Sequence, residues 1–166
     1  MIERIETPWI KWLREPAHER FALAWLQERI PHLDNLGIGD ATYAAIAGGK
    51  SALGAVVAFH DWNQRGGTLQ ISMAADSLVW AKKENITALL RYPFEVVGVN
   101  KIWTGTPSTN ERALRVNEKI GLERQAEVPD QFEPGVGVVF HGMTRAQWLA
   151  SRWSDDDGET QVSVAA

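Results

Sequence analysis

A change in hydrophobic period part-way along the chain constrains its fold more than any other feature of the sequence. Apolar runs typical of β-strands cover Ala41–Ala47, Ala52–Phe59 and Thr68–Met73, and turn-forming residues separate them. Apolar residues then recur at helical spacing over Val79–Val97, after which Lys101–Thr106 again has the pattern of a strand. The sequence therefore predicts three antiparallel strands, then a helix, then a further strand.

Further elements flank this centre. An amphipathic helix is expected over Pro16–Ile30, and Trp9–Leu13 before it has the character of an edge strand or a short helix. Asp76 or Ser77 is a candidate cap for the central helix, which Pro93 should kink or end. The C-terminal part predicts a helix, two strands and a short final helix, over Glu111–Ile120, Glu123–Val128, Val136–His141 and Thr144–Trp153.

This element order predicts an α/β (α+β) fold with a mixed sheet rather than a doubly wound one. The sheet should have an antiparallel N-terminal meander, a parallel central strand pair and flanking helices. Because a strand–helix–strand crossover joins parallel neighbours, the strands ending at Met73 and beginning at Lys101 should lie side by side. Where such strands diverge, a cofactor chain can enter between them, and the next helix N-terminus offers N–H groups to a pyrophosphate.

Charge and length indicate one folded domain at residues 1–153, followed by an acidic, disordered tail at residues 154–166. All 17 basic residues and 17 of the 21 acidic residues precede Ser154, so the folded part is neutral. A neutral domain argues against tight binding along a nucleic-acid backbone. Residues 77–124 hold eight bases against five acids, a modest excess that suits a phosphate-bearing small molecule.

Cysteine is absent, which excludes disulfides, a thiolate nucleophile and zinc-finger ligation. The four histidines are scattered along the sequence, so no metal site is expected. No apolar run approaches the roughly 20 residues that a bilayer span requires, and the first residues lack the pattern of a signal peptide. These observations predict a cytoplasmic protein.

The segment Asn110–Leu122 resembles the fourth helix of the GNAT superfamily of acetyl-CoA-dependent N-acetyltransferases, whose usual pattern is N-x-x-A-x-x-x-Y-x-x-x-G-F. Asn110, Ala113 and Gly121 match this pattern, and the element order agrees with the family from about residue 16 to 146. The resemblance implies that the chain moves an acetyl or related acyl group from acyl-CoA to an amine. Asn117 stands where the family has a tyrosine that protonates the leaving thiolate, and an amide can donate only a hydrogen bond there.

The resemblance also implies a place for the acyl-CoA donor. The family's phosphate motif would lie over Leu78–Lys83, where Ala81 and Lys83 replace glycines and two lysines add positive charge at a helix start. The strand backbone before it would pair with the pantetheine amides. The residues assigned to the donor in this way are Met73, Ala74, Ala75, Val79, Trp80, Ala81, Lys82, Lys83 and Asn110.

His60 and Asp61 are the candidate catalytic pair, together with Asn117. In the fold that the chain resembles, the amine lies near the end of the strand that carries His60, whose ordinary pKa near 6.5 suits a general base. Adjacent strand residues point to opposite faces, so only one of the pair is expected to face the site. Asp76 and Ser77 are the next candidates, while His141 is interpreted as structural.

A second, narrower resemblance suggests an alternative function. Phe59-His60-Asp61-Trp62, with Trp80 and the segment Arg91–Phe94, resembles small phage-encoded GNAT-like proteins related to the Mom proteins, which modify adenine in DNA. A third interpretation is a GNAT-fold domain that binds without catalysis. The neutral charge favours a small-molecule or peptidyl amine over duplex DNA, and the sequence leaves a homodimer open.

Overall fold

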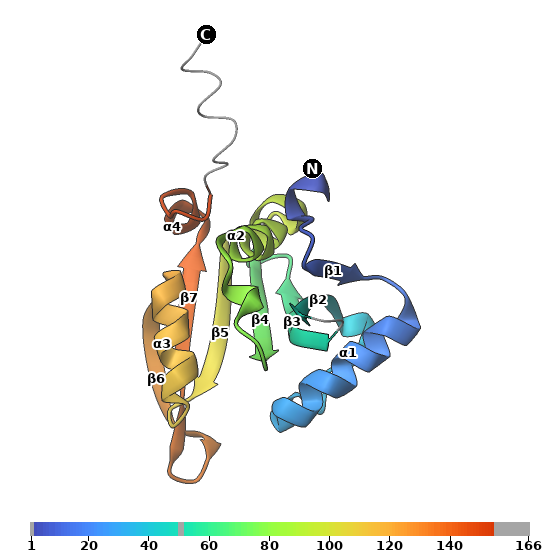
Figure 1. Cartoon of the computed structure of the whole chain (residues 1–166). Coiled ribbons are helices and arrows are strands. Elements are labelled where there is room, and N and C mark those ends of the chain that lie inside the picture. The colour runs from blue at the N-terminus through green and yellow to red at the C-terminus, as the bar shows by residue number, and fades with distance from the viewer. Residues whose placement is uncertain (1, 50–51, 155–166) are drawn as a thin grey trace.

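A seven-stranded sheet forms the centre of the protein (Figure 1). The computed structural model describes residues 2–49 and 52–154, so the predicted tail at 155–166 lies outside the described residues. The strand order is β1-β2-β3-β4-β5-β7-β6. The strands are β1 (Ile10–Leu13), β2 (Ala41–Gly49), β3 (Ala52–Asn63), β4 (Thr68–Ala75), β5 (Lys101–Pro107), β6 (Glu123–Glu133) and β7 (Val136–Thr144).

Helices connect and cover these strands. The α-helices are α1 (Pro16–Arg29), α2 (Lys83–Arg91), α3 (Glu111–Ile120) and α4 (Arg145–Leu149). The shorter helical segments are η1 (Ile2–Ile5), η2 (Pro31–Leu33), η3 (Ile38–Asp40), η4 (Val79–Ala81) and η5 (Tyr92–Val97). None of the helices in the described part of the chain is long and apolar enough to span a bilayer.

The sheet has the predicted mixed topology. β2, β3 and β4 form an antiparallel meander, and β4 pairs in parallel with β5 across the crossover that contains α2. The remaining neighbours are antiparallel. The predicted fold class is therefore confirmed, and Trp9–Leu13 resolves into the edge strand β1.

Apolar side chains on the two faces of the sheet form two cores, because successive strand residues point in opposite directions. One core packs α1 against the sheet and consists chiefly of Ala22, Leu23, Leu26, Tyr43, Val56 and Ala58. The other packs α2 against the opposite face and includes Ala44, Val57, Phe59, Ile86, Leu89 and Phe94. Val116 and Ile120 of α3 pack against this second core, so α2 and α3 share one face and α1 covers the other.

The predicted helix over Val79–Val97 is in fact three segments: η4, α2 and η5. The predicted caps do not cap α2, since Lys82 occupies its N-cap position without a side-chain hydrogen bond. Pro93 ends the regular α-helix as predicted, since α2 finishes at Arg91 and proline has no N–H to donate. Pro93 itself lies in the wider turns of η5, a π-helical segment that ends at Gly98 with a left-handed φ of 83°.

The C-terminal elements differ from the prediction in length. β6 and β7 both extend further than expected, and α4 is confined to Arg145–Leu149. Thr144 caps α4 through a reciprocal pair of hydrogen bonds with Gln147. Residues 150–154 after α4 are not helical, but Trp153 is buried and its indole N–H donates to the carbonyl of Ile120.

Candidate active site

β4 and β5 pair with each other over only three residue pairs. Their parallel register runs from Thr68–Lys101 to Gln70–Trp103, and both strands then continue without pairing to each other. Figure 1 shows the two strands diverging towards their C-terminal ends. We call this region, residues 71–75 of β4 and 104–107 of β5, the β4/β5 separation. Backbone groups of β4 that face β5 there have no strand partner among the described residues, so they are available to a ligand with amide groups of its own.

Met73, Ala74 and Ala75 lie in this separation. Their other edge pairs with Val57, Val56 and Ala55 of β3, which holds the β4 backbone in place. All three residues are partly exposed. The chain therefore presents an ordered, half-free strand edge next to small side chains.

Three side chains on the α1 face of the sheet form a hydrogen-bonded chain beside the separation. His60 of β3 is buried, and its Nε2 lies 2.8 Å from Oγ of Ser72 on β4. Its Nδ1 lies 2.9 Å from the Asp61 carboxylate. A carboxylate only accepts, so Nδ1 donates to Asp61 and the neutral ring accepts from the Ser72 hydroxyl at Nε2. We call these residues the Asp61–His60–Ser72 chain.

His60 and Asp61, of which at most one was expected to face the site, contact each other through a hydrogen bond. Asp61 has a left-handed φ of 51°, which is rare for a residue other than glycine, and the β3–β4 register is irregular between His60 and Asn63. This local bend returns the Asp61 carboxylate to the side of the sheet on which the His60 ring lies. An uncommon backbone conformation of this kind is often found at a functional site.

The environment of His60 keeps its ring neutral near pH 7. Burial lowers the pKa of His60 from its ordinary value of 6.5, and the hydrogen bond and charge of Asp61 partly oppose this shift. The net direction is downward. His60 can therefore accept a proton at neutral pH.

Asn117 lies on the opposite face of the sheet, on α3. Its side-chain amide donates to Oγ1 of Thr106, 3.2 Å away on β5. Continuing the β4–β5 register by two and three residues places Ser72 level with Gly105 and Met73 level with Thr106. The two groups of polar side chains thus flank the β4/β5 separation at the same height, about 7 Å beyond the last strand pair.

Asn110 has a structural task. Its side-chain oxygen accepts from the backbone N–H of Ala113 at 3.2 Å and caps α3, and Gly121 ends the helix with a φ of 107°. These two residues of the recognised motif therefore fix the length of the helix that carries Asn117.

Lys82, at the start of α2, has a partner within the chain. Lys82 Nζ lies 4.1 Å from the centre of the Trp9 ring, and the Trp9 indole N–H donates to Glu84 at 2.9 Å. Trp80 is buried in the α2 core. Contacts within the chain thus account for the position of Lys82 and for the burial of Trp80.

Asp76, a further catalytic candidate, is engaged elsewhere. Its carboxylate binds Arg29 of α1 through two hydrogen bonds of 3.0 and 2.6 Å, and this contact lowers the pKa of Asp76. Ser77 accepts from the N–H of Val79 and stabilises η4. Asp76 thus links the end of β4 to α1, and Ser77 links it to η4.

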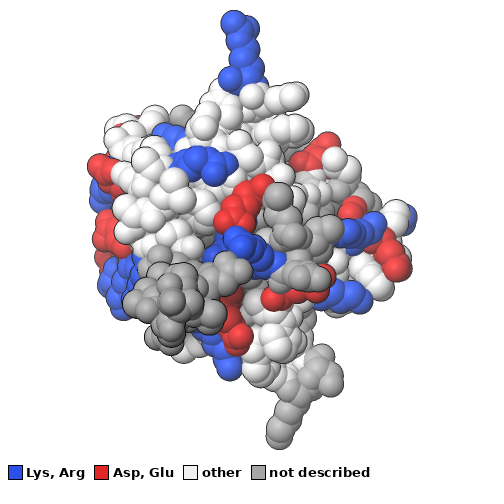
Figure 2. All heavy atoms as spheres, turned by 90° about the horizontal axis from the view of Figure 1, so that it is seen from above, with Lys and Arg blue, Asp and Glu red and all other residues white. Residues whose placement is uncertain are grey.

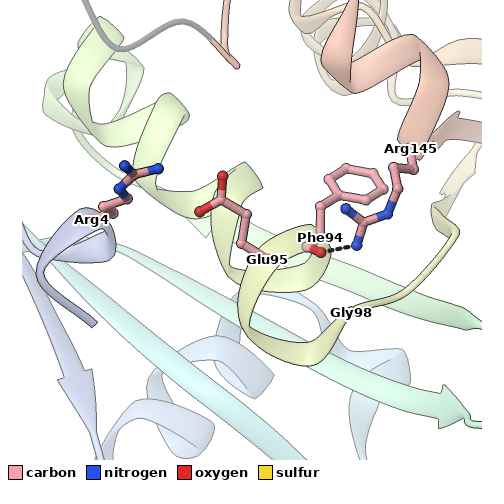
Figure 3. A pocket seen from close by; sticks show the side chains of 5 residues that line it. All are labelled: Arg4, Phe94, Glu95, Gly98 and Arg145. Atoms are coloured by element: carbon pink, nitrogen blue, oxygen red, sulfur yellow. Dashed lines mark hydrogen bonds between the residues drawn. The ribbon is translucent and has the colours of Figure 1, made fainter. Parts of the chain in front are cut away.

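A cavity lies at the other end of β5. It has a volume of about 500 Å³ and is lined by Arg4, Phe94, Glu95, Gly98 and Arg145, with Glu95 directed between the arginines (Figure 3). Arg145 donates there to the carbonyl of Phe94. Gly98 precedes β5 and Arg145 follows β7, so this cavity and the β4/β5 separation lie at opposite ends of β5.

The charges on the end of the molecule seen in Figure 2 are mixed. Basic and acidic side chains alternate among uncharged ones there, and neither sign forms a continuous track on the part drawn in colour or white. Among the described residues no three His, Asp or Glu side chains come together as a metal site would require.

The sequence prediction missed two residues of the site, Ser72 and Thr106. Ser72 occupies a polar position in an alternating strand, between Ile71 and Met73, which was the only available signal. Its approach to His60 depends on the register of the hairpin, in which Ala58 rather than His60 lies opposite Ser72. Thr106 could be found only once the level of α3 against β5 was known.

No protein-family model matches the chain. No curated protein matches it either. Solved structures do match, among them a chimera of the spermidine N-acetyltransferase SpeG from Vibrio cholerae and hSSAT. It has a TM-score of 0.67 and 12% sequence identity, over 86% of this chain and 99% of that chain.

Two further Vibrio cholerae structures agree. The spermidine/spermine N-acetyltransferase SpeG in complex with manganese ions has a TM-score of 0.64 and 15% identity, over 85% and 94% of the two chains. The dodecameric spermidine N-acetyltransferase in an intermediate state has a TM-score of 0.63 and 16% identity, over 88% and 97%. The chain therefore has the fold of the GNAT acetyltransferases, as expected from Asn110–Leu122, whereas the relation to Mom proteins finds no support in these structures.

Proposed function

We propose that this protein is an N-acyltransferase that moves an acetyl or related acyl group from acyl-CoA to an amine. The observation that carries the proposal is the β4/β5 separation, with a buried base on one face and the amide of Asn117 on the other. A donor that enters between the strands would expose its thioester to both groups.

The backbone of Met73, Ala74 and Ala75 would hold the pantetheine part of the donor through its free edge. Its phosphates would lie against the turn Val79–Ala81 and the first N–H groups of α2, where Lys82 and Lys83 add positive charge. Trp80 would support this turn from the core, and Asn110 would act through its cap of α3.

Three residues would serve the chemistry. His60, oriented by Asp61, would take up the proton that the reaction releases, since its ring is neutral at pH 7. Asn117 has two amide hydrogens and uses one towards Thr106, so the second is free to donate to the leaving thiolate. Donors aimed at a developing negative charge stabilise the transition state.

A small or peptidyl amine is a better candidate for the acceptor than duplex DNA. The neutral charge of residues 1–153 provides no excess of cations for the DNA backbone. The similar solved structures are named for spermidine and spermine, which are polyamines. The exposed carboxylate of Asp61, at the end of the Asp61–His60–Ser72 chain, would attract such a cationic acceptor. Localisation in the cytoplasm and a homodimer remain part of this proposal.

The test incubates the protein with acetyl-CoA and, in separate arms, spermidine, a lysine-containing peptide or plasmid DNA. Free thiol and acetylated product are measured together. Equal amounts of thiol and acetylated amine are expected in an amine arm. A modified nucleoside in the DNA arm would contradict the choice of acceptor, and binding of acetyl-CoA without any product would indicate a non-catalytic domain.

The Asn117→Ala variant tests the role of the amide. Loss of one hydrogen bond of about 0.5–1.5 kcal/mol predicts a fall in kcat of roughly 2- to 10-fold. Lys119→Ala, an exposed change on the same helix, is the matched control and should leave kcat unchanged. Full activity of Asn117→Ala would show that this residue is structural.

A further inference from the structure

The Asp61–His60–Ser72 chain joins a hydroxyl, an imidazole and a carboxylate in the order of an activated nucleophile. The distances are 2.8 Å from Ser72 Oγ to His60 Nε2 and 2.9 Å from His60 Nδ1 to Asp61 Oδ2. The first residue comes from β4 and the other two from β3, so the arrangement rests on two paired strands and not on a loop.

Ser72 is the member of this chain that is placed to attack a substrate. His60 is 3% exposed and both of its ring nitrogens are occupied. Asp61 uses its carboxylate to orient the ring. Ser72 is partly exposed and lies two residues past the last β4–β5 pair, inside the β4/β5 separation. The Ser72 hydroxyl, 2.8 Å from His60 Nε2, is therefore the group that a neutral His60 activates.

We propose that Ser72 is a nucleophile that carries the acyl group before the amine receives it. The acyl donor in this step rests on the proposed function, whereas the activation of the serine rests on the three side chains alone. Ser72 Oγ attacks the thioester carbonyl while its proton passes to His60 Nε2. The C–S bond then breaks, and the thiolate takes the proton from His60 and leaves as the thiol.

The second half of the reaction reverses these roles. The amine nitrogen attacks the ester carbonyl on Ser72, its proton passes to His60, and the C–O bond breaks as that proton returns to Oγ. Water can take the place of the amine. The protein alone should therefore hydrolyse acyl-CoA slowly, with one carboxylic acid and one thiol formed for each donor consumed.

A fluorophosphonate probe tests the serine without any acyl-CoA. Such a probe forms a stable bond with a serine hydroxyl that a histidine activates, and intact-protein mass spectrometry detects the adduct. We expect one adduct, mapped to Ser72, in the wild-type chain. Ser72→Ala should abolish it and Asp61→Asn should slow it by about 100-fold or more, the scale of general base catalysis. Ser151→Ala, which removes a partly buried serine of the α4 region, should label as the wild type does.

A second measurement looks for the acyl group itself. The protein is mixed with acetyl-CoA in the absence of amine, quenched in acid and digested, and an acetyl ester on the peptide containing Ser72 is expected. Absence of both adducts from a protein that acetylates amines would overturn the inference and leave the proposed function intact. Labelling of Ser72 by the fluorophosphonate, with no acetyl transfer in any arm, would uphold the activated serine and refute the proposed function. Folding of each variant is checked by its thermal unfolding.

Discussion

His60 is a buried base whose protonation is coupled to the stability of the fold. Burial lowers its pKa below the ordinary 6.5, so the unfolded chain binds a proton more readily than the folded chain does. The stability that follows from this difference is fully present above about pH 6.5 and is lost as the pH falls towards the lowered pKa of the folded state. Because the pKa of His60 is lowered, we also expect the acidic limb of the pH–activity profile to lie below pH 6.5.

The replacement His60→Gln should therefore flatten the pH dependence of stability below pH 6.5. Urea midpoints are measured between pH 7.5 and 5 for the wild type and the variant. The wild-type midpoint should fall more steeply than that of His60→Gln, whereas His18→Gln, at an exposed position, should follow the wild type. Parallel curves for wild type and His60→Gln would show that His60 does not titrate in this way.

His141 presents the opposite case, a buried histidine without hydrogen bonds. It is fully buried on β7, neither ring nitrogen has a hydrogen-bond partner among the described residues, and its Nε2 lies 3.6 Å from a Glu118 carboxylate oxygen. Unpaired buried polar groups cost about 1–3 kcal/mol. His141→Leu should accordingly raise the melting temperature by several degrees in a calorimetric scan. His18→Leu is the exposed control, and a lowered melting temperature for His141→Leu would mean that the imidazole stabilises the fold.

At the level of elements, the hydrophobic period and the order of the segments predicted the sheet well. They predicted the connections between strands poorly. The alternation in Thr68–Met73 and the helical spacing in Glu111–Ile120 each indicate one structure, because each pattern buries one face only. The helical pattern of Val79–Val97 conceals the two breaks at Lys82 and Tyr92, since apolar spacing does not register a change from 3-10 to α to π geometry. The site was harder still to predict from the sequence, because the left-handed φ of Asp61 brings together side chains that ordinary strand geometry keeps apart.

Gly54 shows how the β4–α2 connection is built. Its carbonyl accepts from the N–H groups of Asp76 and Ser77, and a Cβ there would lie 2.5 Å from the Cα of Gly48 on β2. Gly54→Ala must therefore push β2 and β3 apart and disturb the turn that follows the β4/β5 separation. We expect a loss of about 1–3 kcal/mol, measured by urea unfolding.

Gly39→Ala is the matched control for this prediction. A Cβ at Gly39 meets nothing within 4 Å, so this variant should unfold close to the wild-type midpoint. Equal stability of Gly54→Ala and Gly39→Ala would contradict the close approach of β2 and β3.

At the scale of the whole molecule, two candidate ligand sites lie at opposite ends of the central strands. One is the β4/β5 separation, with polar groups on both faces, and the other is the cavity lined by Arg4, Glu95 and Arg145 (Figure 3). The cavity has a volume of about 500 Å³, but its carboxylate lies between its arginines and weakens its attraction for phosphates. The separation offers free backbone, a neutral base and a hydrogen-bond donor within one region. Our account therefore places the acyl-CoA donor between β4 and β5.

Amide hydrogen exchange, resolved by residue in the presence and absence of acetyl-CoA, tests this placement most directly. A ligand paired with the free edge of β4 protects the amides that it binds. The account predicts slower exchange within residues 71–75 and at the start of α2, with unchanged exchange around Glu95 and Gly98. Protection confined to the cavity of Arg4 and Arg145, or no protection in β4 at saturating acetyl-CoA, would contradict it.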